Sequence, residues 1–342
     1  MKKHDGVNKE DNPNTRTIQI LQKMADYYER TQDHWRLTAY RKAIGALRKQ
    51  SNKITTKEEA LAIPSIGERL AEKIEEIVWT NRLRRLDNAE QEPNDEVLQM
   101  FLGIYSVGHA QASTWINQGY RTLEDLSSKA NLTKNQKIGL DHYTDFNTRI
   151  PRAEVERHGT HVRKVIASVN PTIEVTIGGS FRRGAPDSGD VDYLLTSPRL
   201  PLETLRTLFL ESIIPRLFSL NYLKCALATT SPTTGTKWHG AASIPSSNPR
   251  HIWRRVDFLL VPYEELGAAL IYFTGNDIFN RSIRLLASKK GMTLNQRGLW
   301  KDVMRGPGRE KVTEGTLVEG KSEKRIFEIL GVPWRPPEHR IC

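Results

Sequence analysis

The sequence predicts a multidomain protein with an all-helical N-terminal part and an α+β C-terminal part. Three observations lead to this prediction. The chain has 342 residues, more than one ordinary domain needs, which fits two or three compact units. Apolar residues recur at helical spacing up to about residue 85, and a helical-hairpin pattern then occurs twice. Segments typical of β-strands appear only after Pro151.

Composition and charge narrow the class of partner. No apolar run approaches the length of a membrane span, and the first residues lack the apolar core of a signal peptide, so we expect a soluble, intracellular protein without a membrane partner. Cys225 and Cys342 lie far apart and are expected to be reduced thiols. The formal net charge of +11 favours a polyanion such as nucleic acid, although charge alone does not separate such proteins from other basic ones.

The N-terminal part divides into a leader, a helical segment and a repeat. Residues 1–14 are polar and charged, and we expect a flexible leader. Beyond them, apolar side chains recur every three or four residues, and Asn81 ends a long helix. The sequences IPSIG at 63–67 and IYSVG at 104–108 each precede a second helical pattern.

This repeat resembles the helix-hairpin-helix motif, whose turn amides and helix N-terminus contact a DNA phosphate. One copy could equally be an ordinary helical hairpin. Two copies in a basic chain favour binding to the DNA backbone, with Gly67 and Gly108 at the two turns.

Three aspartates in the C-terminal part form the strongest pattern. A strand at 173–177 leads into Gly-Gly-Ser at 178–180, and Asp190 and Asp192 come with the next strand, on one face of it because side chains alternate. Asp257 lies in an otherwise apolar strand, where a carboxylate is costly unless it is paired or bound to metal. A lone Asp-x-Asp is usually a solvated strand edge, but this combination indicates a nucleotidyltransferase site with two Mg²⁺ ions.

The ordered motifs together resemble the family X DNA polymerases of the beta and lambda kind. The likeness runs from about Asp33 to Arg340 and rests on AYRKA at 39–43, LAEKI at 70–74, RIPR at 149–152, GSFRRG at 179–184, GDVD at 189–192, YFTG at 272–275, DIFN at 277–280 and VPWR at 332–335. It implies a helical 5′-deoxyribose-phosphate lyase domain at 15–88, a helix-hairpin-helix subdomain at 89–150, a nucleotidyltransferase palm at 151–262 and a nucleotide-selecting α+β subdomain at 263–342.

The resemblance also implies the roles of the polymerase residues. Asp190 and Asp192 would bind both metal ions, for which Mn²⁺ could substitute, and Asp257 would bind the catalytic ion and help to deprotonate the primer 3′-hydroxyl. The other contacts it implies are those to the triphosphate (Arg149, Ser180, Arg183, Gly189), the sugar (Tyr272, Phe273, Gly275), the incoming base (Asp277, Asn280) and the template strand (Arg284). Without the resemblance, the aromatic pair would be interpreted as core packing.

A second activity is implied for the N-terminal part. Lys73 borders the apolar stripe of its helix, where desolvation and nearby positive charge would lower its pKa. A lysine on a helix is normally just solvated, but Lys73 aligns with the family's Schiff-base nucleophile. The residues expected to form the surrounding 5′-phosphate pocket are Arg36, Tyr40, Lys42 and Arg69.

The implied function is therefore template-directed filling of short gaps in DNA, with a lyase activity. The short segment between Leu227 and Trp238 and the pair at 272–273 favour template dependence. Gln296 stands where the family usually has a glutamate that supports Arg284. We recognise no phosphoesterase or phosphopeptide-binding segment in this sequence, and we therefore expect either a beta-like full protein or a trimmed lambda-like core.

The resemblance also extends to substrates and partners. It implies gapped or nicked DNA with a 5′-phosphate, deoxynucleoside triphosphates, a monomer, a nuclear location, and a monovalent cation at the hairpin turns. It is compatible with DNA ligase or end-joining factors as partners. Two alternatives stay open: a template-independent nucleotidyltransferase, and a non-catalytic gap-binding module of end-joining assemblies.

Overall fold

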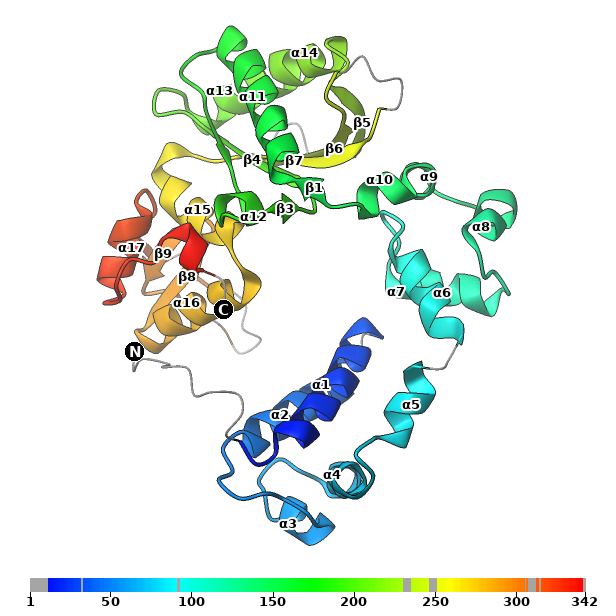
Figure 1. Ribbon diagram of the computed structural model, residues 1–342. Helices are drawn as coiled ribbons and strands as arrows, with labels where there is room; N and C mark the ends of the chain where they lie inside the picture. The colour runs from blue at the N-terminus through cyan, green and yellow to red at the C-terminus, as the bar shows by residue number, and fades with distance from the viewer. Residues whose placement is uncertain are drawn as a thin grey trace. The chain divides into compact units, whose positions relative to one another are not determined.

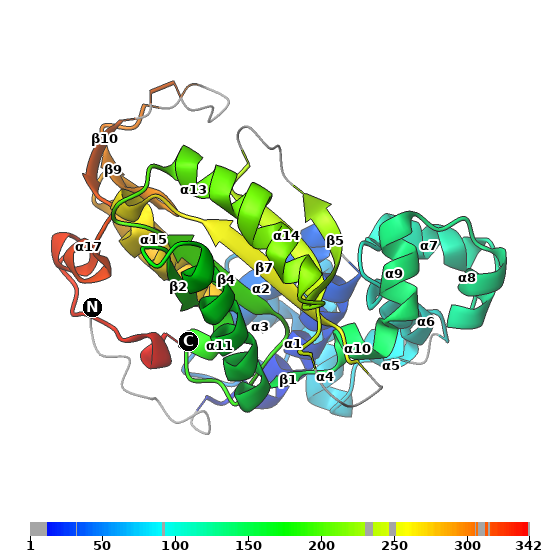
Figure 2. The ribbon, with the colours of Figure 1, turned by 90° about the horizontal axis from the view of Figure 1, so that it is seen from above.

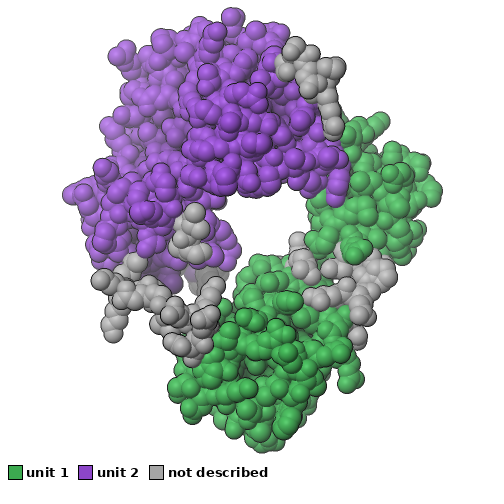
Figure 3. Space-filling view, viewed as in Figure 1, with its two compact units in different colours: residues 1–141 green, residues 142–342 purple. Residues whose placement is uncertain are grey.

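The computed structural model divides into two compact units, residues 1–141 and 142–342 (Figures 1 and 3). It describes residues 12–31, 33–90, 93–229, 235–245, 251–304, 306, 312–313 and 315–340. The predicted order of helical domains followed by an α+β part is confirmed. Within these residues, no helix is both long and apolar enough to cross a membrane.

Five helices in the first unit share one apolar core. Its fully buried members include Leu21, Met24, Leu47 and Ile74. Residues 1–11 of the expected leader lie outside the described part, whereas Asn14 is buried and its Oδ1 accepts a hydrogen bond from the Ile54 amide at 2.8 Å. The helices are α1 (Thr15–Arg30), α2 (His34–Leu47), α3 (Lys57–Leu61), α4 (Glu68–Thr80) and α5 (Arg84–Glu90).

The predicted repeat has the same backbone geometry in both copies. Ser65 and Ser106 adopt left-handed φ values of 77° and 66°. The glycines that follow, Gly67 and Gly108, are extended with ψ of 172° and 171° and begin α4 and α7. The second copy lies among α6 (Pro93–Leu102), α7 (His109–Asn117), α8 (Leu123–Lys129) and α9 (Lys134–Asp141).

The second unit is built on a five-stranded mixed sheet of order β2-β4-β7-β6-β5, in which only β4 and β7 are parallel neighbours. A two-stranded β1-β3 ladder lies beside it. The segment 229–247 is rich in Ser, Thr, Gly and Pro, a composition typical of a hairpin with loops. It contains the end of β5 and all of β6, with residues 230–234 and 246–247 outside the described part. The strands are β1 (Ile150–Pro151), β2 (Glu174–Ile177), β3 (Asp187–Ser188), β4 (Val191–Thr196), β5 (Leu223–Thr229), β6 (Lys237–Ala242) and β7 (Arg254–Leu260).

The two faces of this sheet pack against different parts of the unit, because side chains alternate along each strand. One face, carrying Tyr193 and Phe258, forms the main core of the unit. Helices cover this face (Figure 2). On the opposite face, Leu194 and Leu259 pack near Ala269 of α15 (Leu266–Thr274). Asp192 and Asp257 project from the same face. The covering helices are α11 (Arg152–Val169), α13 (Leu202–Leu208), the π-helical η1 (Phe209–Ile213) and α14 (Ile214–Ser219).

The C-terminal elements form a smaller core joined to the sheet by charged contacts. Arg340 is fully buried and its Nη1 donates to Glu323 at 2.8 Å. Glu323 also accepts from Arg182 of α12 (Gly179–Arg182) at 2.6 Å. This buried chain of charges couples α12 to the C-terminal part. The elements there are α16 (Asp277–Lys289), β8 (Met292–Asn295), β9 (Gly298–Lys301), β10 (Thr316–Glu319) and α17 (Glu323–Ile329).

Candidate active site

Strand register brings two of the predicted aspartates side by side. Asp192 on β4 lies directly opposite Asp257 on the parallel neighbour β7. His239 on β6 lies opposite Asp257 on the other side of β7. Directly opposed residues project from the same face of a sheet. Asp192, Asp257 and His239 therefore form one row across three strands, which we call the carboxylate row.

Asp190, which was expected in the same strand as Asp192, lies beside this row just before β4 begins at Val191. Its Oδ2 lies 3.3 Å from Nη2 of Arg255, which points to the same face of β7 as Asp257. Asp257 is paired as well, through its Oδ1, which lies 2.8 Å from Nδ1 of His239. Each flanking aspartate thus has a cationic or hydrogen-bonding partner, while Asp192 between them is the most crowded carboxylate.

Electrostatics at the row follow from this crowding. Burial, together with the charges of Asp190 and Asp257, raises the pKa of Asp192 from 3.8 to about 7. Burial also raises the pKa of Asp190, against the opposing effect of Arg255. The ionised carboxylates of Asp190, Asp192 and Asp257 therefore repel one another, and a bound cation would reduce this repulsion.

A glycine-serine turn approaches the row from the end of β2. The Gly178 amide donates to the backbone oxygen of Asp192 at 2.9 Å. Gly179 has a φ of +55°, and any Cβ there would collide with the Asp192 carboxylate. Glycine at 179 therefore suits both the left-handed backbone and the close approach of the Asp192 carboxylate.

The phosphate-binding residues expected from the sequence lie around this turn. Ser180 donates its hydroxyl to Ser188 Oγ at 2.8 Å. Arg149 is exposed and pairs with Asp187 at 2.7 Å, next to Gly189. A hydroxyl group and a guanidinium group that can bind an anion thus lie next to the turn.

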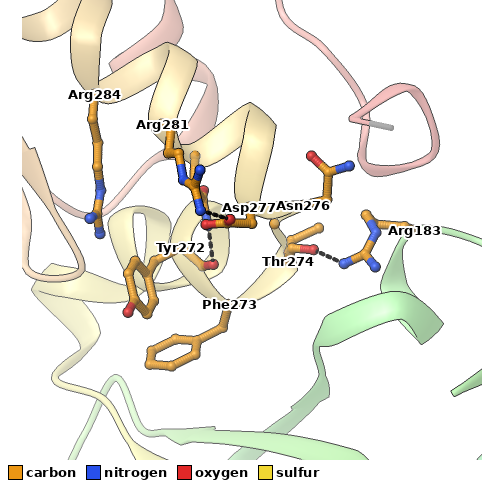
Figure 4. Close-up of a pocket in the computed structure, with 10 residues that line it drawn as sticks. Arg183, Tyr272, Phe273, Thr274, Asn276, Asp277, Arg281 and Arg284 are labelled. Carbon is orange, nitrogen blue, oxygen red and sulfur yellow. Dashed lines mark hydrogen bonds and ion pairs between the residues drawn. The ribbon is translucent and has the colours of Figure 1, made fainter. Parts of the chain in front are cut away.

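A pocket of about 350 Å³ opens next to the turn, between α12, α15 and α16 (Figure 4). Arg183 reaches across its wall and donates to the carbonyl of Thr274. Burial lowers the pKa of Arg183, and the Asp192 charge opposes that effect. Arg183 therefore links the pocket to the carboxylate row. The lining residues are Arg183, Tyr272, Phe273, Thr274, Gly275, Asn276, Asp277, Asn280, Arg281 and Arg284.

Contacts among the pocket residues hold their side chains in place. The rings of Tyr272 and Phe273 meet edge to face at 4.7 Å, and the Arg284 guanidinium lies over the Tyr272 ring at 4.8 Å. Asn280 donates to the Tyr272 carbonyl at 2.8 Å. Gln296 is exposed in the turn between β8 and β9. All six residues predicted to contact sugar, base and template line this one pocket.

The predicted lyase residues lie on α2 and α4 of the first unit. Lys73 is half-buried, and its Nζ donates to the Arg69 carbonyl at 3.1 Å. Arg36 is exposed and pairs with Asp33 at 2.6 Å. Lys42 and Arg69 are exposed as well. Tyr40 is buried, its hydroxyl has no hydrogen-bond partner among the described residues, and burial raises its pKa.

Sequence reasoning missed three charged or polar residues at the site. Arg281 pairs with Asp277 across one helical turn, a spacing that the sequence does reveal. Arg255 precedes Asp257 by two residues and so shares its face, which strand alternation also predicts. His239 had no sequence signal, because its place depends on the register of β6 against β7.

The donor set fits divalent metal ions. Carboxylate oxygens are the ligands that Mg²⁺ prefers, and mutual repulsion in the row would fall on binding. Within the described chain, no three His, Cys, Asp or Glu side chains already converge as ligands. Asp190 pairs with Arg255, and Asp257 pairs with His239. When an ion binds, both carboxylates would therefore rotate so that one oxygen of each points towards Asp192.

A mixed sheet with a carboxylate row, a glycine-serine turn and an adjoining arginine-lined pocket defines a nucleotidyltransferase palm. Family models match the chain in consecutive segments: a helix-hairpin-helix domain at 12–83, the fingers domain of DNA polymerase lambda at 99–147, the DNA polymerase beta palm at 149–263 and the DNA polymerase beta thumb at 269–341. The chain belongs to the family X DNA polymerases, among the beta- and lambda-like members, as its motifs predicted.

Individual relatives agree with this assignment. DNA polymerase lambda of Rattus norvegicus is 37% identical over 96% of the chain, and that of Arabidopsis thaliana is 32% identical over 96%. DNA-directed DNA/RNA polymerase mu of Homo sapiens is 27% identical over 89%. The chain spans 56%, 62% and 64% of the length of these three proteins.

Proposed function

We propose that this protein is a template-directed DNA polymerase that fills short gaps in DNA by nucleotidyl transfer. The observation that carries the proposal is the position of Arg183, which belongs to the pocket wall and acts electrostatically on Asp192 of the carboxylate row. A nucleoside triphosphate with its base in the pocket would thereby extend its phosphates towards the carboxylates. The substrates are gapped DNA with a 5′-phosphate and deoxynucleoside triphosphates.

The residues of the chain would bind and orient the two reactants. Ser180, Arg183 and Arg149 surround the glycine turn and would hold the triphosphate, which is a polyanion. The edge of Tyr272 would exclude a ribose 2′-hydroxyl by contact. Asp277 and Asn280 lie in the first turn of α16, where both line the pocket, and they would face the incoming base.

The carboxylate row would hold two Mg²⁺ ions. When bound, they would promote ionisation of the primer 3′-hydroxyl and neutralise the charge of the pyrophosphate leaving group. Asp190 and Asp192 would contact both ions, and Asp257 the one on the primer side. Asp257 lies between Asp192 and His239 in the carboxylate row.

We also propose a 5′-deoxyribose-phosphate lyase activity in the first unit. The amine of Lys73 would add to the aldehyde carbon of the opened sugar and release water, forming an imine. Arg36, Lys42 and Arg69 are exposed cationic side chains on the same two helices and would hold the 5′-phosphate. The position of Lys73 supports this role, because it lies half-buried on α4 with its Nζ held beside the Arg69 backbone carbonyl.

The remaining assignments follow from the same function. We propose subdomains at 15–88, 89–150, 151–262 and 263–342, and phosphate contacts at the hairpin turns of Gly67 and Gly108. A monovalent cation at those turns, a monomeric state and a nuclear location are part of the proposal. DNA ligase or end-joining factors would act on the filled product.

A gap-filling assay tests the polymerase activity. A single-nucleotide gap with a downstream 5′-phosphate should be filled with the templated nucleotide, and Asp257→Asn should lose extension by at least about a hundredfold, because a ligand to the catalytic ion is removed. Equal extension of a single-stranded primer would instead indicate a template-independent transferase. Gap binding without extension would indicate a non-catalytic module.

The lyase activity has its own measurement. Borohydride should trap the wild type on preincised abasic DNA as a covalent adduct, and Lys73→Ala should trap weakly while gap filling persists. Lys23→Ala serves as the matched control, since Lys23 is an exposed lysine on α1 that is not among the residues expected to bind the 5′-phosphate. Trapping of Lys73→Ala at the wild-type rate would exclude Lys73 as the nucleophile.

A further inference from the structure

We propose that His239 is a positioning residue for the polymerase site, holding one oxygen of Asp257 so that the other is presented to the catalytic metal ion. The inference rests on the proposed polymerase function and adds a residue that the motifs do not contain. It is carried by strand register, hydrogen-bond geometry and burial.

Backbone register determines where His239 points. It is the antiparallel partner of Asp257, which is in turn the parallel partner of Asp192. The neighbouring residue of β6, Trp238, packs in the core on the helix-covered face. Because side chains alternate, His239 projects from the carboxylate face.

The contact itself is short and partly shielded. Nδ1 of His239 lies 2.8 Å from Oδ1 of Asp257, and the two side chains are 31% and 27% exposed. An ionised carboxylate only accepts hydrogen bonds, so the ring nitrogen that faces it carries the hydrogen and donates. A hydrogen bond to a charged acceptor is among the stronger kinds in proteins.

This geometry supports metal binding and does not compete with it. A carboxylate has two oxygens, and His239 contacts Oδ1 alone. Without the imidazole, Asp257 would be free to rotate away from the charges of Asp190 and Asp192. Partners of this kind orient ligating carboxylates, and their loss commonly weakens metal affinity about 10- to 100-fold.

The test compares two substitutions at one position. His239→Leu removes the donor, whereas His239→Asn keeps a nitrogen donor one bond beyond Cγ, where Nδ1 stands. Mn²⁺ binding is measured by electron paramagnetic resonance on the full-length protein, in complex with gapped DNA, a dideoxy-terminated primer and the matching nucleotide. We expect the Mn²⁺ dissociation constant to rise about 10- to 100-fold for the leucine variant and to stay within about threefold for the asparagine variant.

Kinetics provide the second readout. With an extendable primer, His239→Leu should require more Mg²⁺ for half-maximal rate, and the KM for the nucleotide should change little, because the pocket is untouched. His251→Leu is the matched control: His251 is an exposed histidine just before β7 and should behave as wild type. Thermal unfolding of each variant separates a folding defect from a local one.

Three outcomes would overturn the proposal. The leucine variant could bind Mn²⁺ as the wild type does, it could bind more tightly, which would make His239 a competitor of the metal, or the asparagine variant could fail as badly as leucine. Failure of the underlying function looks different. In that case the wild type would not extend a gapped primer, whatever residue stands at 239.

Discussion

Replacing Asp192 by asparagine should stabilise the metal-free protein at neutral pH while it abolishes nucleotide addition. Burial and the charges of Asp190 and Asp257 raise the pKa of Asp192 to about 7, against 3.8 ordinarily. A difference of one pKa unit corresponds to about 1.4 kcal/mol, so ionised Asp192 lowers the stability of the fold by up to about 4 kcal/mol. Asparagine has nearly the same shape and carries no charge.

The pH dependence has a definite sign. Below about pH 4 the carboxyl is protonated in both the folded and the unfolded chain, and it costs the fold nothing. As pH rises towards 7, the unfolded chain loses this proton first and the stability of the wild type falls. The advantage of Asp192→Asn should therefore be largest above pH 7 and vanish near pH 4.

The gain in free energy of unfolding of Asp192→Asn over the wild type is measured by urea unfolding of both proteins in EDTA. Hydrogen exchange of the β4 amides then reports whether the gain is local to the site. Added Mg²⁺ should raise the stability of the wild type and have little effect on Asp192→Asn, because an ion that binds only the folded state stabilises it. The electrostatic account of the row would be refuted if wild type and Asp192→Asn had the same free energy of unfolding at pH 7.5. It would also be refuted if their difference in free energy were as large at pH 4.5 as at pH 7.5.

Three further changes have expected outcomes. Glu323→Ala should lower the free energy of unfolding in urea by about 3–5 kcal/mol, because it leaves Arg340 buried without its carboxylate partner. Glu328→Ala removes an exposed ion pair on the same helix and should cost less than about 1 kcal/mol. Similar losses for the two variants would contradict this. Gly179→Ala should reduce gap filling at least about tenfold through collision at the row, and wild-type extension rates would show that the turn adapts. Tyr272→Ala should lower the ratio of deoxy- to ribonucleotide incorporation, and an unchanged ratio would mean that another residue reads the sugar.

Local patterns were sufficient for much of the fold and site. Helical spacing, the two hairpin turns and the strand containing Asp192 are properties of short segments, and the structure has all of them, with Asp190 just before that strand. Even the pair of Asp277 and Arg281 follows from one helical turn. The contacts that sequence reasoning did not find are those between distant segments. Glu323, for example, meets Arg182 across 141 positions of the chain.

The placement of His239 shows why such contacts escape a reading of sequence alone. A slip of one residue between β6 and β7 would send the histidine into the core and Trp238 to the carboxylate face. What prevents the slip is packing: Trp238 is 3% exposed and meets Phe258 edge to face at 5.8 Å. Gly240 leaves the room that the Trp238 ring occupies, since a Cβ at 240 would overlap that ring. The orientation of a polar residue beside the carboxylates is thus set by an aromatic side chain on the opposite face, and core packing and site geometry are two consequences of one strand register.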